Sequence, residues 1–187
     1  MSKSLNVAVC QINPSLGNFQ KNIDIISKNY KYAVEKGADL VVFPEMSITG
    51  YPPQDLLNSK EFISQNISSL NELTKSTTIP CILGYVDFED NKKFNAAAVC
   101  QDGEIVYKYH KIHLPNYDVF DERRYFQSGD SIGIFDLKVN NSDYKIALQI
   151  CEDLWEDEYE RKISEETIEN DPCLLYTSPS PRDQRGS

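Results

Sequence analysis

The segment ADLVVFPE, residues 38–45, contains a continuous apolar run after Asp39 and ends in an acidic residue. An uninterrupted apolar run of this length is typical of a strand covered on both faces, because a strand with one wet face alternates polar and apolar residues. Before it, apolar residues recur at steps of three or four over residues 18–36, and Gly37 then supplies a helix stop. We therefore expect a helix followed by a strand of a covered sheet, with Glu45 at the end of that strand.

The rest of the chain mixes strands joined by helices with strands joined by tight turns. A second amphipathic helix is predicted over residues 59–75, after a loop rich in glycine and proline at residues 47–54. Further strands are predicted at residues 5–12, 79–86, 94–100, 104–109, 132–139 and 144–150. Asp102-Gly103 is typical of a two-residue hairpin turn. A length of 187 residues is ordinary for one domain and short for two, so one α/β domain or part of one is expected.

The charge of the chain is concentrated in one segment. The formal net charge is −10, and residues 152–171 hold ten acidic residues against two basic ones, which leaves the remainder nearly neutral. We interpret this segment as a local solvated stretch, and we expect no nucleic-acid partner because no basic surface is indicated. The N-terminal apolar run is interrupted by Asn6 and Gln11, so neither a signal peptide nor a membrane span is predicted.

The five cysteines are spaced irregularly, at positions 10, 81, 100, 151 and 173. With no export signal, this pattern favours reduced thiols in the cytoplasm over a disulfide framework, and no pair has the spacing of zinc ligands. Cys10, Cys81 and Cys100 lie inside apolar strand runs and are expected in the core. Cys151 differs, because it comes at the end of a predicted strand.

Three chemically distinct groups stand at strand ends: Glu45, Lys111 and Cys151. In sheets packed with helices, sites gather beyond the carboxyl ends of strands, so parallel neighbouring strands would bring the three groups into one pocket. A cysteine nucleophile needs a base or cation nearby, a part that Glu45 can play, and Lys111 can stabilise an oxyanion. The alternative reading is a solvated glutamate, a solvated lysine and an inert buried cysteine.

Three longer motifs surround these residues. GADLVVFPEMSITGYPPQDLL at 37–57, YHKIHLPNYDVFDERRYF at 109–126 and LQICEDLW at 148–155 together resemble the carbon-nitrogen hydrolase (nitrilase-like) superfamily. Within it, they are most similar to the glutaminase domain of glutamine-dependent NAD synthetases. The resemblance runs from about residue 5 to residue 160.

The resemblance implies an α-β-β-α four-layer sandwich and a role for each matched residue. Glu45 would be the general base, Lys111 the oxyanion stabiliser and Cys151 the nucleophile. Glu122 would be a further active-site carboxylate that orients the lysine. The remaining substrate-binding residues, which would help to hold glutamine, are Tyr51, Tyr117 and Glu152.

The resemblance also implies partners. Ammonia released from glutamine would pass to a C-terminal synthetase domain, which uses ATP and magnesium to amidate deamido-NAD, and such proteins work as homo-oligomers. No cofactor and no metal are expected in the glutaminase domain itself. His110 and His113 are interpreted as support for the loop around Lys111 and not as metal ligands.

The chain departs from the family pattern after Cys151, where 36 residues remain and no synthetase motif follows. We expect a domain that is incomplete at its C-terminus, covering residues 1–170. Residues 171–187 resemble a translated cloning or sequencing adapter and are expected to belong to no element, although a native disordered tail is the alternative.

Two other functions stay open. One is a stand-alone amidase or nitrilase that uses the same three residues on another small amide or nitrile. The other is a non-catalytic binding protein, or an inactive fragment.

Overall fold

The computed structural model describes residues 4–155, 159–172 and 174–178. Its first sheet has five strands in the order β1-β2-β3-β4-β5. Their bounds are β1 Val7–Val9, β2 Leu40–Val42, β3 Cys81–Glu89, β4 Lys92–Gln101 and β5 Glu104–His110. Strands β1, β2 and β3 are parallel, whereas β4 is antiparallel to both of its neighbours. As a result β5 runs in the same direction as β2 and β3, and the carboxyl ends of these strands lie at one edge.

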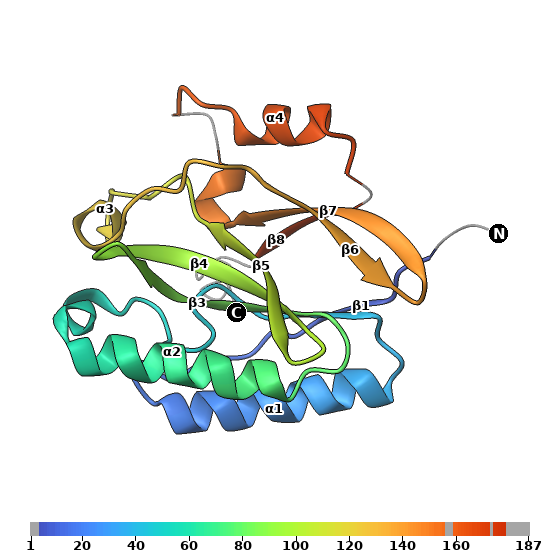
Figure 1. The fold of residues 1–187 in the computed structure, drawn as a ribbon. Helices are drawn as coiled ribbons and strands as arrows, with labels where there is room; N and C mark the ends of the chain where they lie inside the picture. Colours follow the sequence, from blue (N-terminus) through green and yellow to red (C-terminus); the bar gives the residue numbers. More distant parts are fainter. Residues whose placement is uncertain (1–3, 156–158, 173, 179–187) are drawn as a thin grey trace.

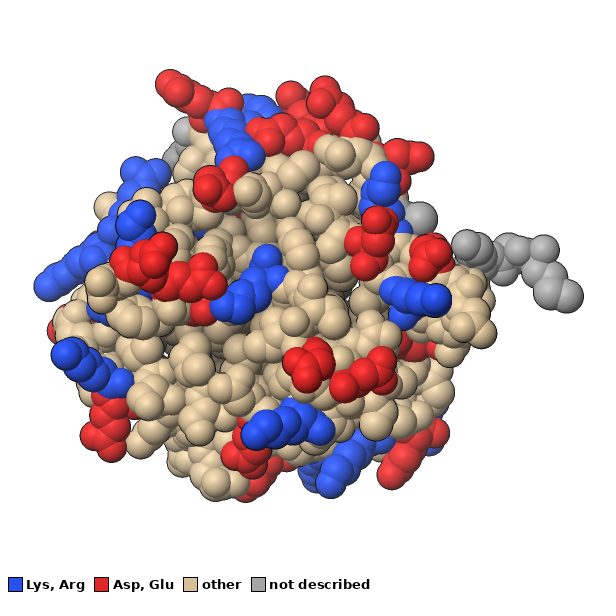
Figure 2. All heavy atoms as spheres, viewed as in Figure 1, with Lys and Arg blue, Asp and Glu red and all other residues tan. Residues whose placement is uncertain are grey.

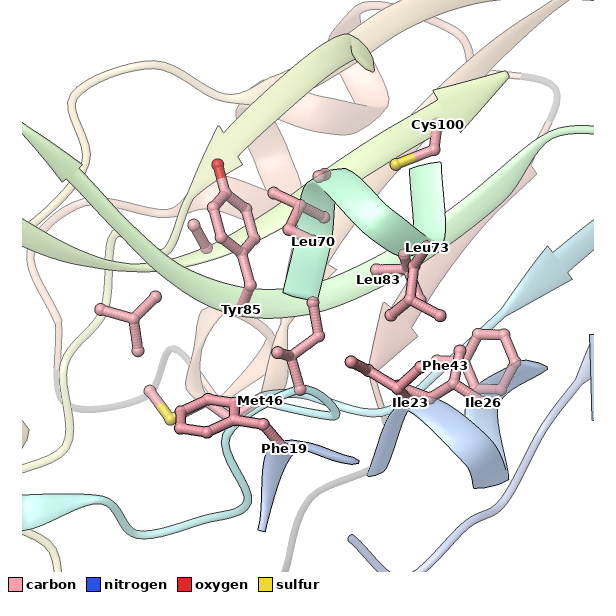
Figure 3. Packing of buried hydrophobic residues seen from close by; sticks show 14 of the residues in the cluster. Phe19, Ile23, Ile26, Phe43, Met46, Leu70, Leu73, Leu83, Tyr85 and Cys100 are labelled. Carbon is pink, nitrogen blue, oxygen red and sulfur yellow. The ribbon is translucent and has the colours of Figure 1, made fainter. Parts of the chain in front are cut away.

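Two long helices, α1 (Phe19–Glu35) and α2 (Lys60–Lys75), cover one face of this sheet (Figure 1). Both begin at a polar cap, since the side chain of Asn18 accepts from the Lys21 amide and that of Ser59 from the Phe62 amide. The apolar stripes of the helices pack on side chains of β2 to β4, and Figure 3 shows this core. The labelled members are Phe19, Ile23, Ile26, Phe43, Met46, Leu70, Leu73, Leu83, Tyr85 and Cys100.

A second sheet packs on the other face of the first. It contains β6 (Gly133–Val139), β7 (Ser142–Ile150) and β8 (Leu174–Ser178), in that order. The core between the sheets includes Val42, Ile82 and Val99 of the first sheet and Leu137, Ile146 and Leu148 of the second. Helix α4 (Ile163–Glu169) lies beyond the second sheet, opposite α1 and α2 (Figure 1). The order of layers is therefore α-β-β-α, which confirms the predicted fold class.

Three short elements fill the connections at the edge where β2, β3 and β5 end. They are η1 (Gln54–Asn58), α3 (Glu122–Tyr125) and η2 (Cys151–Leu154). The expected Asp102-Gly103 hairpin is present, with φ of 50° and 83° at its two residues, as a turn between antiparallel strands requires.

Strand β8 corrects one expectation from the sequence. Leu174–Ser178 pairs in parallel with Ile146–Ile150 of β7, so the prediction that residues 171–187 belong to no element is wrong for this stretch. The run LLYTS contains residues that are typical of strands, but the serine-, proline- and arginine-rich composition of the residues after it outweighs this signal. The proposed adapter origin of residues 171–187 and the domain boundary at 170 stay predictions. Cys173 and residues 179–187 lie outside the described residues.

The acidic segment is also different from the expected solvated stretch. Part of it forms α4, and acidic side chains gather over this helix at the top of Figure 2. However, Glu152 is only 5% exposed and Asp153 is fully buried, so the prediction is wrong at these two residues. Within the described part of the chain, no helix is long and apolar enough to cross a membrane.

The described cysteines follow the expectation in part. Cys81 and Cys100 are buried in the core, as predicted, while Cys10 is half-buried. None of the four described cysteines forms a disulfide.

Candidate active site

Glu45, Lys111 and Cys151 were expected to share a pocket if their strands were parallel neighbours. In the structure these strands are not neighbours. Glu45 follows β2 and Lys111 follows β5, and β3 and β4 lie between these two strands. Cys151 follows β7 of the second sheet. The three groups converge although that condition is not met, since Lys111 pairs with Glu45 and interacts electrostatically with Cys151 across two stacked sheets.

The ammonium of Lys111 lies between two carboxylates. Its Nζ is 2.7 Å from Oε1 of Glu45 and 3.1 Å from Oε1 of Glu122. Lys111 is fully buried, and Glu45 and Glu122 are 5% and 4% exposed. Ion pairs with so little access to water are strongly coupled, since a low local dielectric increases each Coulomb interaction.

The protonation state of Lys111 follows from this arrangement. Burial alone lowers the pKa of an ammonium, but the negative charges of Glu122 and Glu45, together with the electrostatic interaction with Cys151, raise the Lys111 pKa well above its usual range. Burial also raises the pKa of Glu122, Lys111 opposes this shift, and Glu45 adds to it. Lys111 is thus a fixed cation beside Cys151 and not a proton acceptor.

Asn95 is a member of the site that the sequence analysis missed. Its side-chain Nδ2 donates to Glu45 Oε1 at 2.6 Å and to Glu122 Oε2 at 3.2 Å, while its backbone carbonyl accepts from the Lys111 backbone amide at 2.8 Å. The residue is fully buried on β4. The available signal was an amide side chain inside the apolar run FNAAAVC, where a buried polar group needs a partner.

The backbone around Glu45 is held against β3 at a glycine. A Cβ at Gly84 would overlap the backbone of Pro44 and Met46, so only glycine lets the turn after β2 approach the sheet this closely. The Gly84 carbonyl accepts from the Ile48 amide at 3.1 Å and from the Ser47 hydroxyl at 3.2 Å. These contacts fix the turn that carries Glu45.

Cys151 stands at the sharp turn from β7 into η2. Its φ is 48°, a left-handed conformation that is uncommon for a residue with a Cβ. Such strain persists only where the surroundings impose it, and it is concentrated at functional positions. The side chain is 8% exposed.

The other predicted residues lie around this centre. The Tyr51 hydroxyl donates to Glu122 Oε1 at 2.9 Å, and the Tyr117 hydroxyl lies 2.9 and 3.1 Å from the two carboxylate oxygens of Glu152. The Phe120 ring lies between the two tyrosines, with ring centroids 6.3 Å from Tyr51 and 5.7 Å from Tyr117. The seven predicted residues thus form two linked clusters, one around Lys111 and one around Glu152 beside Cys151.

The two histidines are engaged in other contacts. His110 stacks on Phe94 at 4.0 Å, and its Nε2 lies 2.9 Å from Asp87 Oδ2. His113 stacks on Tyr159 at 3.8 Å, and its Nε2 lies 3.0 Å from the carbonyl oxygen of Arg161.

Asp87, Glu89 and His110 form the one group of possible metal ligands among the residues that the structure describes. The ammonium of Lys108 already lies 3.0 Å from Asp87 and 2.9 Å from Glu89, in the place a cation would take. A groove of about 880 Å³ between α2 and β3 to β5 also borders Asp87, but none of the seven predicted residues lines it. The absence of a metal and a cofactor at the predicted site stays a prediction.

The four-layer sandwich and the grouped cysteine, glutamate and lysine define the class of nitrilase-like hydrolases. The sequence model of the carbon-nitrogen hydrolase family matches residues 6–178. The chain therefore belongs to the carbon-nitrogen hydrolase family.

Within this family, the chain is similar to glutamine-dependent NAD(+) synthetases. A glutamine-dependent NAD(+) synthetase from Thermotoga maritima is 41% identical over 156 residues, which is 82% of this chain and 26% of the relative. The structure of a glutamine-dependent NAD+ synthetase from Acinetobacter baumannii has a TM-score of 0.84 at 30% identity, over 98% of this chain and 35% of that one. An amidase from Nesterenkonia sp. AN1 shares the fold, with a TM-score of 0.78 at 19% identity over 98% of this chain and 71% of that one. The chain matches the glutaminase part of the synthetases and spans about a quarter to a third of their length.

Proposed function

We propose that the protein hydrolyses the side-chain amide of glutamine and releases ammonia, with Cys151 as nucleophile. The observation that carries the proposal is the buried ammonium of Lys111, 2.7 Å from Glu45 and electrostatically coupled to Cys151. A fixed cation in a dry site stabilises an oxyanion best, because nothing has to reorganise when the charge develops.

The reaction proceeds in two acyl transfers. The Cys151 sulfur attacks the amide carbon, Glu45 accepts the thiol proton, and Lys111 stabilises the oxyanion of the tetrahedral intermediate. Glu45 then donates the proton to the departing nitrogen, and ammonia leaves a thioester on Cys151. Water, deprotonated by Glu45, attacks the thioester to give glutamate and the restored thiol. Asn95 and Glu122 keep Glu45 and Lys111 in place by their hydrogen bonds.

Glu152 and Tyr117 support an amino acid as the substrate. The Glu152 carboxylate comes directly after Cys151, is 5% exposed and is held by the Tyr117 hydroxyl. A buried carboxylate at this position suits the α-ammonium group of glutamine, since a positive partner offsets its desolvation. The names of the relatives, which are glutamine-dependent, support the same substrate.

The ammonia would be consumed by a synthetase region, as the names of the glutamine-dependent NAD(+) synthetases support. That this region uses ATP and magnesium to amidate deamido-NAD is what the family resemblance implies. We extend the proposal to a homo-oligomeric assembly and to a cytoplasmic location, both by resemblance to the family.

Ammonia release from glutamine by the full-length product of the source gene tests the proposal. Cys151→Ala should abolish release, while the control Cys10→Ala, which alters a half-buried thiol directly after β1, should leave it unchanged. Equal release by the Cys151→Ala protein would refute the role of the nucleophile. Faster hydrolysis of acetamide or propionamide than of glutamine would instead favour a stand-alone amidase.

A further inference from the structure

Asp153 connects the two sheets at the candidate site. Its Oδ1 accepts from the backbone amides of Ile112 and His113, at 3.1 and 2.8 Å. Its Oδ2 accepts from the Tyr109 hydroxyl at 2.8 Å and from the Ile150 amide at 3.0 Å. The carboxylate is fully buried, and all four donors are uncharged groups. Burying a carboxylate costs free energy unless the group is well hydrogen-bonded. The four hydrogen bonds therefore offset the desolvation of the Asp153 carboxylate.

The residues that donate to Asp153 are close in sequence to Lys111 and Cys151. Tyr109 comes two residues before Lys111, and Ile112 and His113 come directly after it. Ile150 comes directly before Cys151. One side chain therefore holds the chain on both sides of the lysine and at the residue that leads into the nucleophile.

The backbone of Lys111 is fixed separately. Its amide donates to the Asn95 carbonyl at 2.8 Å, and its carbonyl accepts from the Gly129 amide at 2.9 Å. Neither contact reaches β7. Asp153 joins the backbone that follows Lys111 to the Ile150 amide at the end of β7, and the Tyr117 hydroxyl adds a second link through the Glu152 carboxylate.

We propose that Asp153 is a positioning residue that sets the distance between the Lys111 ammonium and the Cys151 sulfur by joining the ends of β5 and β7. Its four hydrogen bonds go to three backbone amides next to the reacting groups and to the Tyr109 hydroxyl, so it acts through the backbone that carries them. The inference rests on the proposed function, in which the lysine stabilises charge that develops next to the cysteine. Small displacements of such a pair matter, because a shift of about 1 Å can reduce a rate by about 100-fold.

Asp153→Asn tests the proposal with almost no change of shape. The asparagine amide can take two orientations. In one, its NH2 group faces the Ile150 amide, and in the other it faces the amides of Ile112 and His113. Either way at least one hydrogen bond is replaced by two donors that face each other. The Tyr109 hydroxyl can rotate and accept instead. We expect kcat for ammonia release, per titrated Cys151, to fall about 100-fold with little change in KM.

Two control variants separate positioning from general loss of stability. Tyr109→Phe removes one donor and keeps the three amides, so kcat should fall roughly 3-fold to 10-fold. Tyr30→Phe removes a buried hydroxyl that accepts from the Thr78 and Ile79 amides at 2.8 and 2.9 Å and donates to the Ile79 carbonyl at 3.1 Å, before the start of β3 and away from the edge that carries the site. It should lower the melting temperature and leave kcat unchanged.

A second readout does not require glutamine. Alkylation of Cys151 by iodoacetamide, followed by mass spectrometry of its peptide, should be about 10-fold slower in Asp153→Asn, since the cation that favours the thiolate is displaced. If the unsubstituted protein releases no ammonia from glutamine, the proposed function fails while this comparison still tests Asp153. Folded Asp153→Asn protein with unchanged kcat and alkylation rate overturns the inference. If that variant does not fold, an unchanged kcat and alkylation rate in Tyr109→Phe overturn it.

Discussion

Replacing Asn95 by aspartate converts the amide that bridges two carboxylates into a third carboxyl group. The Nδ2 position lies 2.6 Å from Glu45 and 3.2 Å from Glu122. At an effective dielectric constant of about 20, a negative charge there would be repelled by about 6 kcal/mol and about 5 kcal/mol by the two neighbours. Taking up a proton at pH 7 costs a carboxyl group with a pKa of about 3.9 only about 4 kcal/mol. The three carboxyl groups should therefore bind an extra proton in the folded protein.

The stability of this variant should depend on pH in a defined direction. The pKa of the introduced carboxyl is raised on folding, so the variant is least affected below about pH 4 and loses stability as pH rises. The loss should reach about 4 kcal/mol near pH 7, with a slope of about 1.4 kcal/mol per pH unit. One hydrogen bond is lost in addition, since a protonated carboxyl has a single donor.

Urea unfolding of the wild type and the variant between pH 5 and pH 8 measures this difference. Asn95→Ala is the matched control, because it removes both hydrogen bonds and adds no ionisable group, so its deficit should be nearly independent of pH. A deficit of Asn95→Asp that does not change with pH would refute the contacts assigned to Asn95.

Two more variants test the electrostatics. Lys111→Gln leaves Glu45 with a buried carboxylate neighbour and no cation, so we expect a stability loss of about 3–5 kcal/mol by urea unfolding and a kcat for ammonia release lower by about 100-fold to 1,000-fold. Burial raises the pKa of Asp87, but hydrogen bonds from His110 and Lys108 outweigh it and lower the pKa to about 2. The ionised Asp87 carboxylate therefore stabilises the folded protein by about 2 kcal/mol above pH 4, and this contribution is lost as pH falls towards 2. The free energy of unfolding of Asp87→Asn should accordingly be lower than that of the wild type at pH 7 and equal to it near pH 2. A deficit that is equal at both pH values would contradict this assignment.

The sequence predicted most of the fold because its signals are local. The apolar run before Glu45, the helical periodicity before Gly37 and the turn at Asp102-Gly103 each define an element from neighbouring residues. Strand β8 is only five residues long and adjoins a stretch rich in serine, proline and arginine, and its pairing with a distant partner is not visible in local composition. The division of the strands between two sheets is a long-range property too, and strand patterns do not encode it.

The site was predictable to a similar extent. Glu45, Lys111 and Cys151 are recognisable because they are reactive groups at strand ends, and the motifs around them add the tyrosines and Glu152. Asn95 and Asp153 are different. Their importance comes from which atoms they meet across the molecule, and in the sequence they are one amide in a strand and one acid in an acidic segment.

The placement of the reactive groups on two sheets has a consequence for folding. The first sheet is built from residues 7–110 and the described strands of the second from residues 133–178, so each can form from its own continuous stretch of chain. The lysine and the thiol meet only when the sheets dock. Until then Cys151 has no cation beside it and reacts as an ordinary thiol, about 3–10% ionised at neutral pH. The nucleophilicity that we propose for Cys151 would thus be acquired at the last assembly step, and the rate of Cys151 alkylation during refolding would report when that step occurs.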